Sequence, residues 1–230
     1  MLDLYGRGWQ MLEGGLVTVQ LCLTVLPFMI IIGLLGASAK LSRYRSLRII
    51  GESYTVLIRG IPELLVILLI YFGGTIAVQN IAELISGEET RVDIPAFWSG
   101  VAALALVQGA FASEVFRAAM QSIPVGQIEA ATACGMTPRQ IFTRIKLPQL
   151  WRFALPGLNN LFQVLIKDTA LISVVGVEEI MRKAAIGAGT DKAPFTFYLV
   201  AMLMFLSFTT VSLIAFNYLE KRAARGIARA

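Results

Sequence analysis

The sequence predicts an all-α integral membrane protein with five transmembrane helices in a single domain, residues 1–230. Hydrophobic residues make up 57% of the chain and charged residues 15%, whereas charged residues make up about 25% of a typical soluble domain. The apolar residues also gather in five stretches poor in charge, and most of these approach the roughly 20 residues that cross a bilayer. With their flanking turns, the expected spans are residues 16–39, 55–79, 96–117, 151–177 and 194–219.

The first and last apolar stretches argue most strongly against a soluble helical protein. That alternative arises because an apolar run of about 14 or 15 residues can also be a buried core helix. An amphipathic surface helix would carry a polar stripe at helical spacing, and residues 17–39 and 195–218 carry no such stripe. We therefore expect both stretches to cross the membrane.

A cleaved signal peptide is the alternative for the first stretch, since Ala37-Ser38-Ala39 resembles a cleavage site. The apolar part of a signal is about 7 to 15 residues long and follows a basic start. Here the run is longer, and its leader carries Asp3 and Glu13 as well as Arg7. We expect this span to be retained.

The cysteine and histidine content excludes several classes of protein. Cys22 lies inside the first span and Cys134 lies in a polar loop, so no disulfide framework is indicated. The chain has no histidine, which removes histidine-based catalysis and the commonest ligand of transition metals. We expect no catalytic residue and no metal site.

Basic residues are concentrated in alternate loops, and the cytoplasmic side is the one that accumulates them. Fourteen of the 20 follow the first, third and fifth spans: Lys40, Arg43, Arg45, Arg48, Arg59, Arg117, Arg139, Arg144, Lys146, Arg152, Lys221, Arg222, Arg225 and Arg229. This bias predicts an N-terminus outside and a C-terminus in the cytoplasm. Because the charges are divided among short loops, no nucleic-acid partner is expected.

The loop between the third and fourth spans, residues 124–148, contains its own helix signals. Pro124 suits the start of a helix, and Gly135 suits the left-handed residue just past a helix end. These positions predict a short helix over residues 125–134.

A second helix is predicted directly afterwards. Thr137 can cap it, Pro138 fits its first turn, and Gln140 stands three residues after the cap, which completes a capping box. We expect Pro148 to interrupt this helix, because proline lacks the backbone N–H of a helix interior. The loop is therefore predicted to be a cytoplasmic helix-turn-helix.

Seven residues of this loop stand at the spacing of the EAA loop of binding-protein-dependent ABC importers, and the chain resembles that family. They are Glu129, Ala130, Ala131, Gly135, Ile145, Leu147 and Pro148. The resemblance implies the fold of a type I ABC importer permease, in which this loop is the coupling helix. It also implies that the seven residues dock onto a separate ATP-hydrolysing subunit.

Four further stretches resemble the polar amino-acid subgroup: residues 14–18, 59–63, 113–117 and 167–171. The glutamate at position 63 makes the chain resemble most closely the Q-type subunit of histidine, lysine, arginine, ornithine and opine permeases. The resemblance implies a bacterial inner-membrane protein that pairs with a homologous M-type permease as a heterodimer. It further implies two ATP-binding subunits, a periplasmic or extracellular substrate-binding protein, surrounding membrane lipid, and a polar amino-acid substrate, for which basic amino acids or opines are preferred.

The chain is expected to be a non-catalytic transport subunit that binds no cofactor. It has no Gly-x-x-x-x-Gly-Lys-Ser/Thr loop with which to hold nucleotide phosphates. ATP and magnesium are therefore expected on the partner ATPase.

The fourth span is the predicted lining of the substrate pathway. Residues 156–157 and 167–169 interrupt its apolar sequence, and broken helices recur at transporter binding sites. Ionisable or strongly polar groups at membrane depth tend to face a cavity or a partner. The candidate pathway residues are Asp168, Gln163, Asn160, Glu63 and Glu114.

Each acidic candidate also has a structural interpretation. Asp168 either meets the cationic end of a substrate, or it has a structural role in which it caps a half-helix or pairs with a charge on the partner subunit. Glu114 stands three residues before Arg117, so the two can simply neutralise each other. Glu63 either lines the inner mouth or is solvated by lipid headgroups.

Two other functions compete with an importer subunit. An ion- or proton-coupled secondary transporter would use Asp168 and Glu114 as relay groups, but such carriers commonly contain inverted repeats, and none is visible here. A membrane scaffold or enzyme anchor would not need polar breaks in its fourth span.

Overall fold

The structure is a computed structural model that describes residues 4–86 and 94–224. These residues form helices joined by short turns, without a strand in the described ranges. Five helical segments are long and apolar enough to cross a membrane: Gly8–Lys40, Glu63–Ile85, Ala96–Gln121, Pro138–Val175 and Pro194–Ala223. The predicted all-α class and the predicted number of spans are confirmed.

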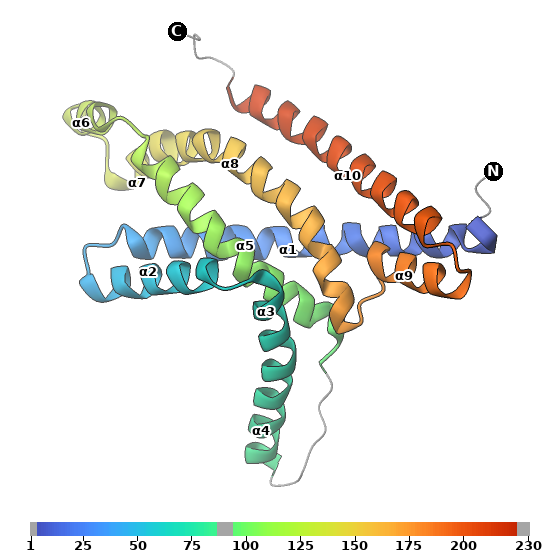
Figure 1. The fold of residues 1–230 in the computed structure, drawn as a ribbon. Helices are drawn as coiled ribbons and strands as arrows, with labels where there is room; N and C mark the ends of the chain where they lie inside the picture. Colours follow the sequence, from blue (N-terminus) through green and yellow to red (C-terminus); the bar gives the residue numbers. More distant parts are fainter. Residues whose placement is uncertain (1–3, 87–93, 225–230) are drawn as a thin grey trace.

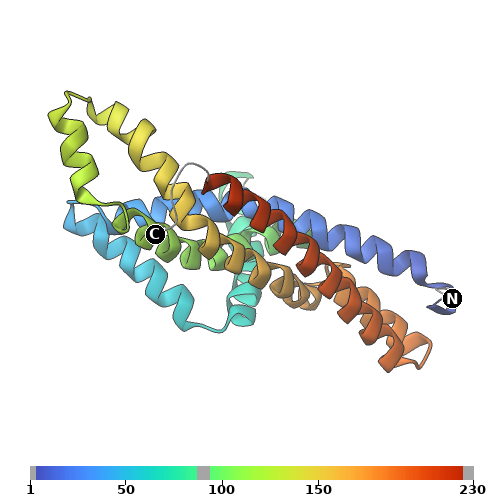
Figure 2. The same cartoon turned by 90° about the horizontal axis from the view of Figure 1, so that it is seen from above.

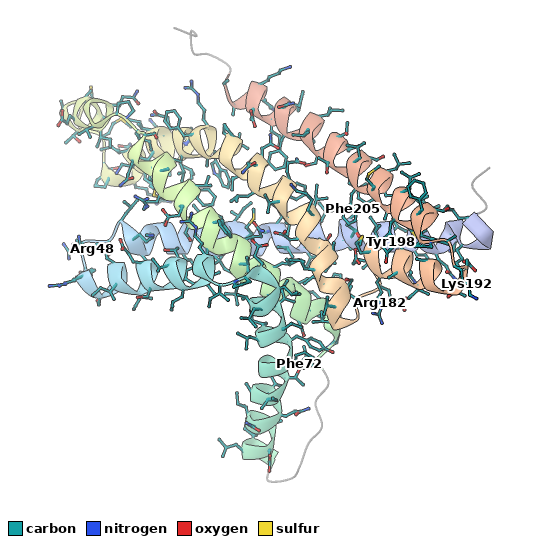
Figure 3. All side chains as sticks on the ribbon, in the orientation of Figure 1. Arg48, Phe72, Arg182, Lys192, Tyr198 and Phe205 are labelled. Atoms are coloured by element: carbon teal, nitrogen blue, oxygen red, sulfur yellow. The ribbon has the colours of Figure 1, made fainter. Side chains whose placement is uncertain are left out.

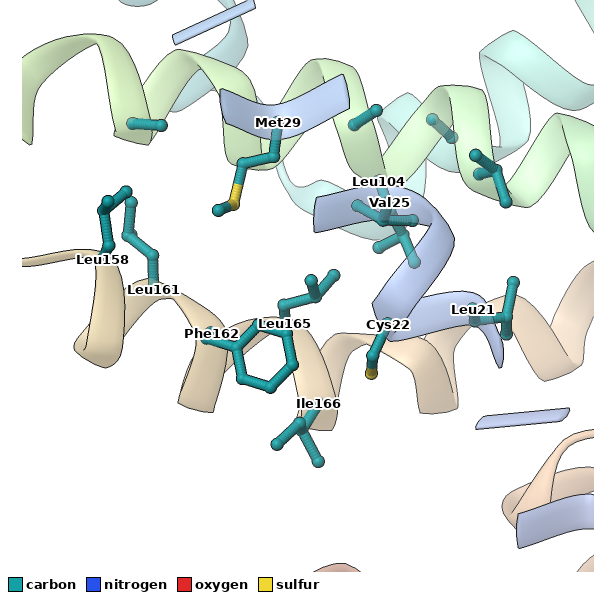
Figure 4. Close-up of a cluster of buried hydrophobic side chains, with 14 of the residues drawn as sticks. Leu21, Cys22, Val25, Met29, Leu104, Leu158, Leu161, Phe162, Leu165 and Ile166 are labelled. Carbon is teal, nitrogen blue, oxygen red and sulfur yellow. The ribbon is translucent and has the colours of Figure 1, made fainter. Parts of the chain in front are cut away.

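Three long helices pack side by side to form the core. Helix α1 (Gly8–Lys40) lies along α5 (Ala96–Gln121), and α8 (Leu147–Asp168) packs against α5. Glycine allows α1 and α5 to approach closely, because a Cβ atom at Gly33 would lie only 2.7 Å from that of Ala112. Figure 4 shows the buried apolar side chains that fill this core, among them Leu21, Val25 and Met29 of α1, Leu104 of α5, and Leu161, Phe162 and Leu165 of α8.

The last span completes one side of the bundle. Helix α10 (Pro194–Ala223) packs against α8 and against the short helix α9 (Ile180–Thr190). The N-terminal end of α1 and α9 lie at one end of the molecule, whereas α6 (Val125–Ala133) and the turn after α1 lie at the other (Figure 1, Figure 2). The short helix α9 thus lies at the opposite end from the loop that is predicted to be cytoplasmic.

The second span differs from the single helix predicted over 55–79. Helix α2 (Arg45–Gly60) ends before Ile61 and Pro62, and α3 (Glu63–Leu68) then starts in a new direction. Ile61 is extended because a following proline disfavours helical backbone.

Helix α3 continues through a π-helical turn, η2 (Leu69–Gly73), into α4 (Gly74–Ser86). This segment leaves the bundle steeply, as Figure 1 shows, and Figure 3 shows Phe72 on it. Its side chains are largely exposed, up to 87% for Leu84. Because these side chains are apolar, we expect lipid or another subunit to cover them.

The loop between the third and fourth spans contains the two helices that were predicted, but the second one does not end at Pro148. Helix α7 (Pro138–Ile141) continues through the π-helical turn η3 (Phe142–Lys146) into α8, where Pro148 occupies the first turn. The expected interruption is therefore wrong. A π turn does not require the usual hydrogen bond between residues four apart, so it accommodates a proline that cannot donate one.

The fourth span changes its helix type near its C-terminal end. Helix α8 passes through Pro156 without ending, so no break occurs there. At Asp168 the α-helix gives way to the 3-10 helix η4 (Thr169–Val175), which Gly176 ends with φ of 95°. The second of the two predicted breaks thus coincides with a real change of helix type.

Candidate functional site

Four of the seven signature residues in the loop between the third and fourth spans line one surface. Ala130, Ala131, Ile145 and Pro148 line a shallow depression of about 410 Å³ between α6 and the start of α8. Glu129 is exposed on α6 beside it. Leu147 is half-buried and packs against the core instead. Residues almost 20 positions apart in the sequence therefore share a concave surface outside the bundle.

Hydrogen bonds fix the shape of this surface. After α6, Gly135 adopts φ of +76°, and the Met136 N–H donates to the Ala131 carbonyl at 3.0 Å, which closes a Schellman motif. The predicted capping box is present, since the Thr137 N–H donates to Gln140 Oε1 at 2.9 Å and the Gln140 N–H donates to Thr137 Oγ1 at 3.3 Å. These bonds hold α6 at a set angle to α7.

A second group of candidate residues meets inside the bundle. Gln108 of α5 donates from Nε2 to Asp168 Oδ2 at 2.5 Å. The Glu63 carboxyl, at the start of α3, is near enough to the Asp168 carboxyl for the two groups to interact electrostatically. Three helices thus bring two carboxyl groups and an amide together, and we call Glu63, Gln108 and Asp168 the acidic cluster.

Gln108 was not among the residues predicted from the sequence. Its side chain is completely buried, and Gln108 Oε1 has no hydrogen-bond partner within the described part of the chain. The available signal was a strongly polar side chain in the middle of the third span, where lipid would not solvate it. Its role as the partner of Asp168 depends on packing between α5 and α8, which sequence periodicity does not specify.

The other polar candidates on α8 do not join the acidic cluster. Gln163 Nε2 donates to Ser212 Oγ at 2.9 Å, so this side chain is directed to α10. Asn160 is exposed. Asn159 donates to Glu220 Oε1 at 3.2 Å. The structure therefore separates Gln163 and Asn160 from Asp168.

Glu114 lies in an ion-pair network rather than in a simple pair. Its Oε2 atom is 2.7 Å from Arg117 Nη2, as the spacing of three residues predicts. Its Oε1 atom accepts a hydrogen bond from Lys40 Nζ and lies 4.0 Å from Arg59 Nη1. Lys40 Nζ also donates to Thr55 Oγ1 at 2.8 Å. Glu114 thus ties α1, α2 and α5 together.

Comparison with known proteins decides the family. A family model described as the binding-protein-dependent transport system inner membrane component matches residues 29–225. This chain belongs to that family. The predicted resemblance is therefore confirmed, and the match includes the whole loop over residues 124–148.

Relatives in this permease family are similar to this chain over nearly its full length. The nopaline transport system permease protein of Agrobacterium fabrum (strain C58) is 48% identical over 222 residues, which cover 96% of this chain and 94% of that protein. The histidine/lysine/arginine/ornithine transport system permease protein HisQ of Escherichia coli (strain K12) is 40% identical over 227 residues, 99% of each. Among solved structures, a chain in the crystal structure of an amino acid ABC transporter with histidines has 29% sequence identity to this chain and a TM-score of 0.80. The match covers 96% of this chain and 97% of that one.

Membership in this permease family settles the broad function. The chain is a membrane transport component, and this interpretation is supported over an ion- or proton-coupled secondary transporter. The family in general works with a partner permease, an ATPase and a substrate-binding protein.

Proposed function

We propose that this chain forms half of the translocation pathway for basic amino acids or opines. It pairs with a homologous M-type permease, two ATP-binding subunits and an external substrate-binding protein. It binds no ATP or magnesium itself. Its N-terminus is outside the bacterial inner membrane and its C-terminus is in the cytoplasm, as the distribution of basic residues favours.

The observation that carries the substrate class is the acidic cluster. Glu63 and Asp168 place two carboxyl groups side by side within the membrane-spanning region. Adjacent carboxylates repel each other, and a cation between them relieves that repulsion. The ammonium or guanidinium group of a basic amino acid is such a cation. The names of the two relatives, which include histidine, lysine, arginine, ornithine and nopaline, support the same class.

The depression beside α6 supports the proposed docking of an ATPase. Glu129 offers an exposed charge, and small side chains at Ala130 and Ala131 permit close approach of a partner. Gly135, Ile145, Leu147 and Pro148 would shape and support this surface. Because α7 continues into α8, a displacement of the loop would be carried directly into the span that holds Asp168.

The substitution Asp168→Asn tests the substrate class. It removes one charge and nearly preserves the shape of the side chain. We expect uptake of arginine to fall about tenfold or more, corresponding to about 1.4 kcal/mol, and uptake of a neutral amino acid to fall much less. Both rates are normalised to the amount of assembled complex.

Glu83→Gln is the matched control, because Glu83 is an exposed acidic residue of α4, away from the acidic cluster. This control should leave both uptake rates near those of the unmodified protein. Equal losses for the charged and the neutral substrate in Asp168→Asn would show that Asp168 is structural.

A further inference from the structure

The ion-pair network around Glu114 has more positive than negative groups. Lys40, Arg59 and Arg117 all surround one carboxylate. Lys40 and Arg117 make the close contacts, and the 4.0 Å separation leaves Arg59 without a tight bond to it. A guanidinium has five N–H donors, so Arg59 has donors available for another anion.

Arg59 is both positioned and accessible. Its guanidinium carbon lies 5.2 Å from the centre of the Phe111 ring, a distance at which a cation is attracted to the ring face. Its side chain remains 45% exposed. It stands near the end of α2, four residues before Glu63 and on the other side of the turn at Pro62.

Helix α5 relates Arg59 to the acidic cluster. Gln108, Phe111 and Glu114 follow one another at intervals of three residues, so they form one row along the surface of α5. Gln108 holds Asp168, Phe111 lies beneath Arg59, and Glu114 is the network carboxylate. At 1.5 Å per residue, the ends of this row are about 9 Å apart along the helix axis, and at 3.6 residues per turn they are about 120° apart around it. The negative and positive groups therefore lie on either side of Phe111 in this row, one to two turns apart along α5.

We infer that Arg59 binds the α-carboxylate of an amino acid whose cationic end lies at Glu63 and Asp168. This inference rests on the proposed function and adds the second half of the substrate site. An extended arginine or lysine separates its two charged ends by a distance comparable to one to two helical turns. A guanidinium fork also matches the planar geometry of a carboxylate, with which it can form two parallel hydrogen bonds.

The test combines two ligands with single substitutions in the purified full complex, without the external binding protein. Arginine is compared with agmatine, which has the same guanidinium but lacks the α-carboxylate. Binding is measured by calorimetric titration. The unmodified complex should bind arginine more tightly than agmatine. Arg59→Gln should weaken arginine roughly 10- to 100-fold, as expected for a lost charged hydrogen bond, and leave agmatine unchanged.

Arg48→Gln is the matched control, since Arg48 is an exposed arginine on the same helix, toward its opposite end (Figure 3). It removes the same charge and should change neither affinity. Arg59→Lys keeps the cation but not the planar fork. This variant should bind arginine with an affinity between those of the unmodified complex and Arg59→Gln, which would show that the site remains folded.

Several outcomes would overturn the inference: equal weakening of both ligands by Arg59→Gln, no weakening of arginine, equal affinities in the unmodified complex, or no saturable binding of arginine. Failure of the proposed function has a different signature. Asp168→Asn should weaken both ligands, because both carry the cation. If Asp168→Asn leaves agmatine binding unchanged, the proposed cationic site at Asp168 is refuted. The result for Arg59 is not affected by that outcome.

Discussion

Glu179 is a completely buried carboxyl group at the start of α9, outside the membrane-spanning segments. It caps this helix by accepting hydrogen bonds from the N–H groups of Met181 at 2.9 Å and Arg182 at 2.8 Å. Burial raises the pKa of Glu179 from 4.5 to about 7, although the two hydrogen bonds oppose this change. The native protein therefore holds a proton here that the unfolded chain releases at lower pH.

This residue predicts a pH-dependent difference in stability. Between pH 4.5 and about 7 the native state binds more protons than the unfolded state, so the contribution of Glu179 to stability falls as pH rises through this window. Glu179→Gln keeps an acceptor oxygen but does not titrate. We therefore compare the Tm of the variant with the Tm of the unmodified complex at each pH. The difference, variant minus unmodified, should increase from pH 4.5 to about 7. A constant difference across that range would contradict the assignment.

At the scale of single residues, the sequence predicted the loop better than the pathway. Thr137 and Gln140 were identified correctly, because a capping box is a local pattern with fixed spacing. Gln108 was missed, and Gln163 was placed with Asp168 although it bonds to Ser212. These partners are set by how α5, α8 and α10 pack, and polarity alone does not reveal which helix a side chain faces.

At the scale of elements, the cytoplasmic helix pair depends on a backbone conformation that few residues adopt. Gly135 has φ of +76°, and a Cβ atom there would meet nothing within 4 Å. Glycine is therefore required at this position for its backbone conformation and not for its small size. This conformation sets the angle between α6 and α7, and that angle shapes the depression proposed to receive the ATPase.

Two substitutions at this position separate conformation from side-chain size. Gly135→Val should leave the complex assembled but strongly reduce uptake and substrate-stimulated ATP hydrolysis, because a β-branched residue is strained by about 1–3 kcal/mol in the left-handed region. Gly135→Asn should retain most of both activities, since asparagine tolerates that conformation. Normal coupling in a fully expressed Gly135→Val complex would refute the docking role of this loop.

The continuous helix from α7 to α8 was not predicted. The sequence indicated a stop at Pro148, because proline is a reliable local signal against a regular helix interior. The π-helical turn over Phe142–Lys146 that accommodates it is a property of the folded backbone. The break between α2 and α3 was missed although Pro62 signals it, because the predicted span was extended past this proline from the apolar run over residues 64–78.

At the scale of the whole molecule, the two ends of the bundle face different compartments in the proposed topology. Arg48 lies toward the end that holds α6, whereas Arg182 and Lys192 lie near α9 at the opposite end (Figure 3). The clustering of basic residues assigns the α6 end to the cytoplasm. The number of spans was predictable because it follows from composition and length, which do not depend on tertiary packing.

Labelling of introduced cysteines checks this orientation. The exposed native Cys134 is first replaced by serine, whereas Cys22 is buried and can remain. In intact cells, a membrane-impermeant thiol reagent should then modify Lys192→Cys but not Arg139→Cys, and permeabilised cells should show both. The reverse pattern in intact cells would invert the topology.

The most direct measurement is uptake into vesicles by the complex purified through a tag on this chain. The tagged chain should bring with it a second permease and an ATP-binding subunit. After reconstitution with the external binding protein, vesicles should accumulate labelled arginine only when ATP is supplied on the side of α6, and a proton ionophore should not reduce that uptake. Arginine accumulation driven by a proton or sodium gradient without ATP, or purification of the chain without any ATP-binding subunit, would contradict the account.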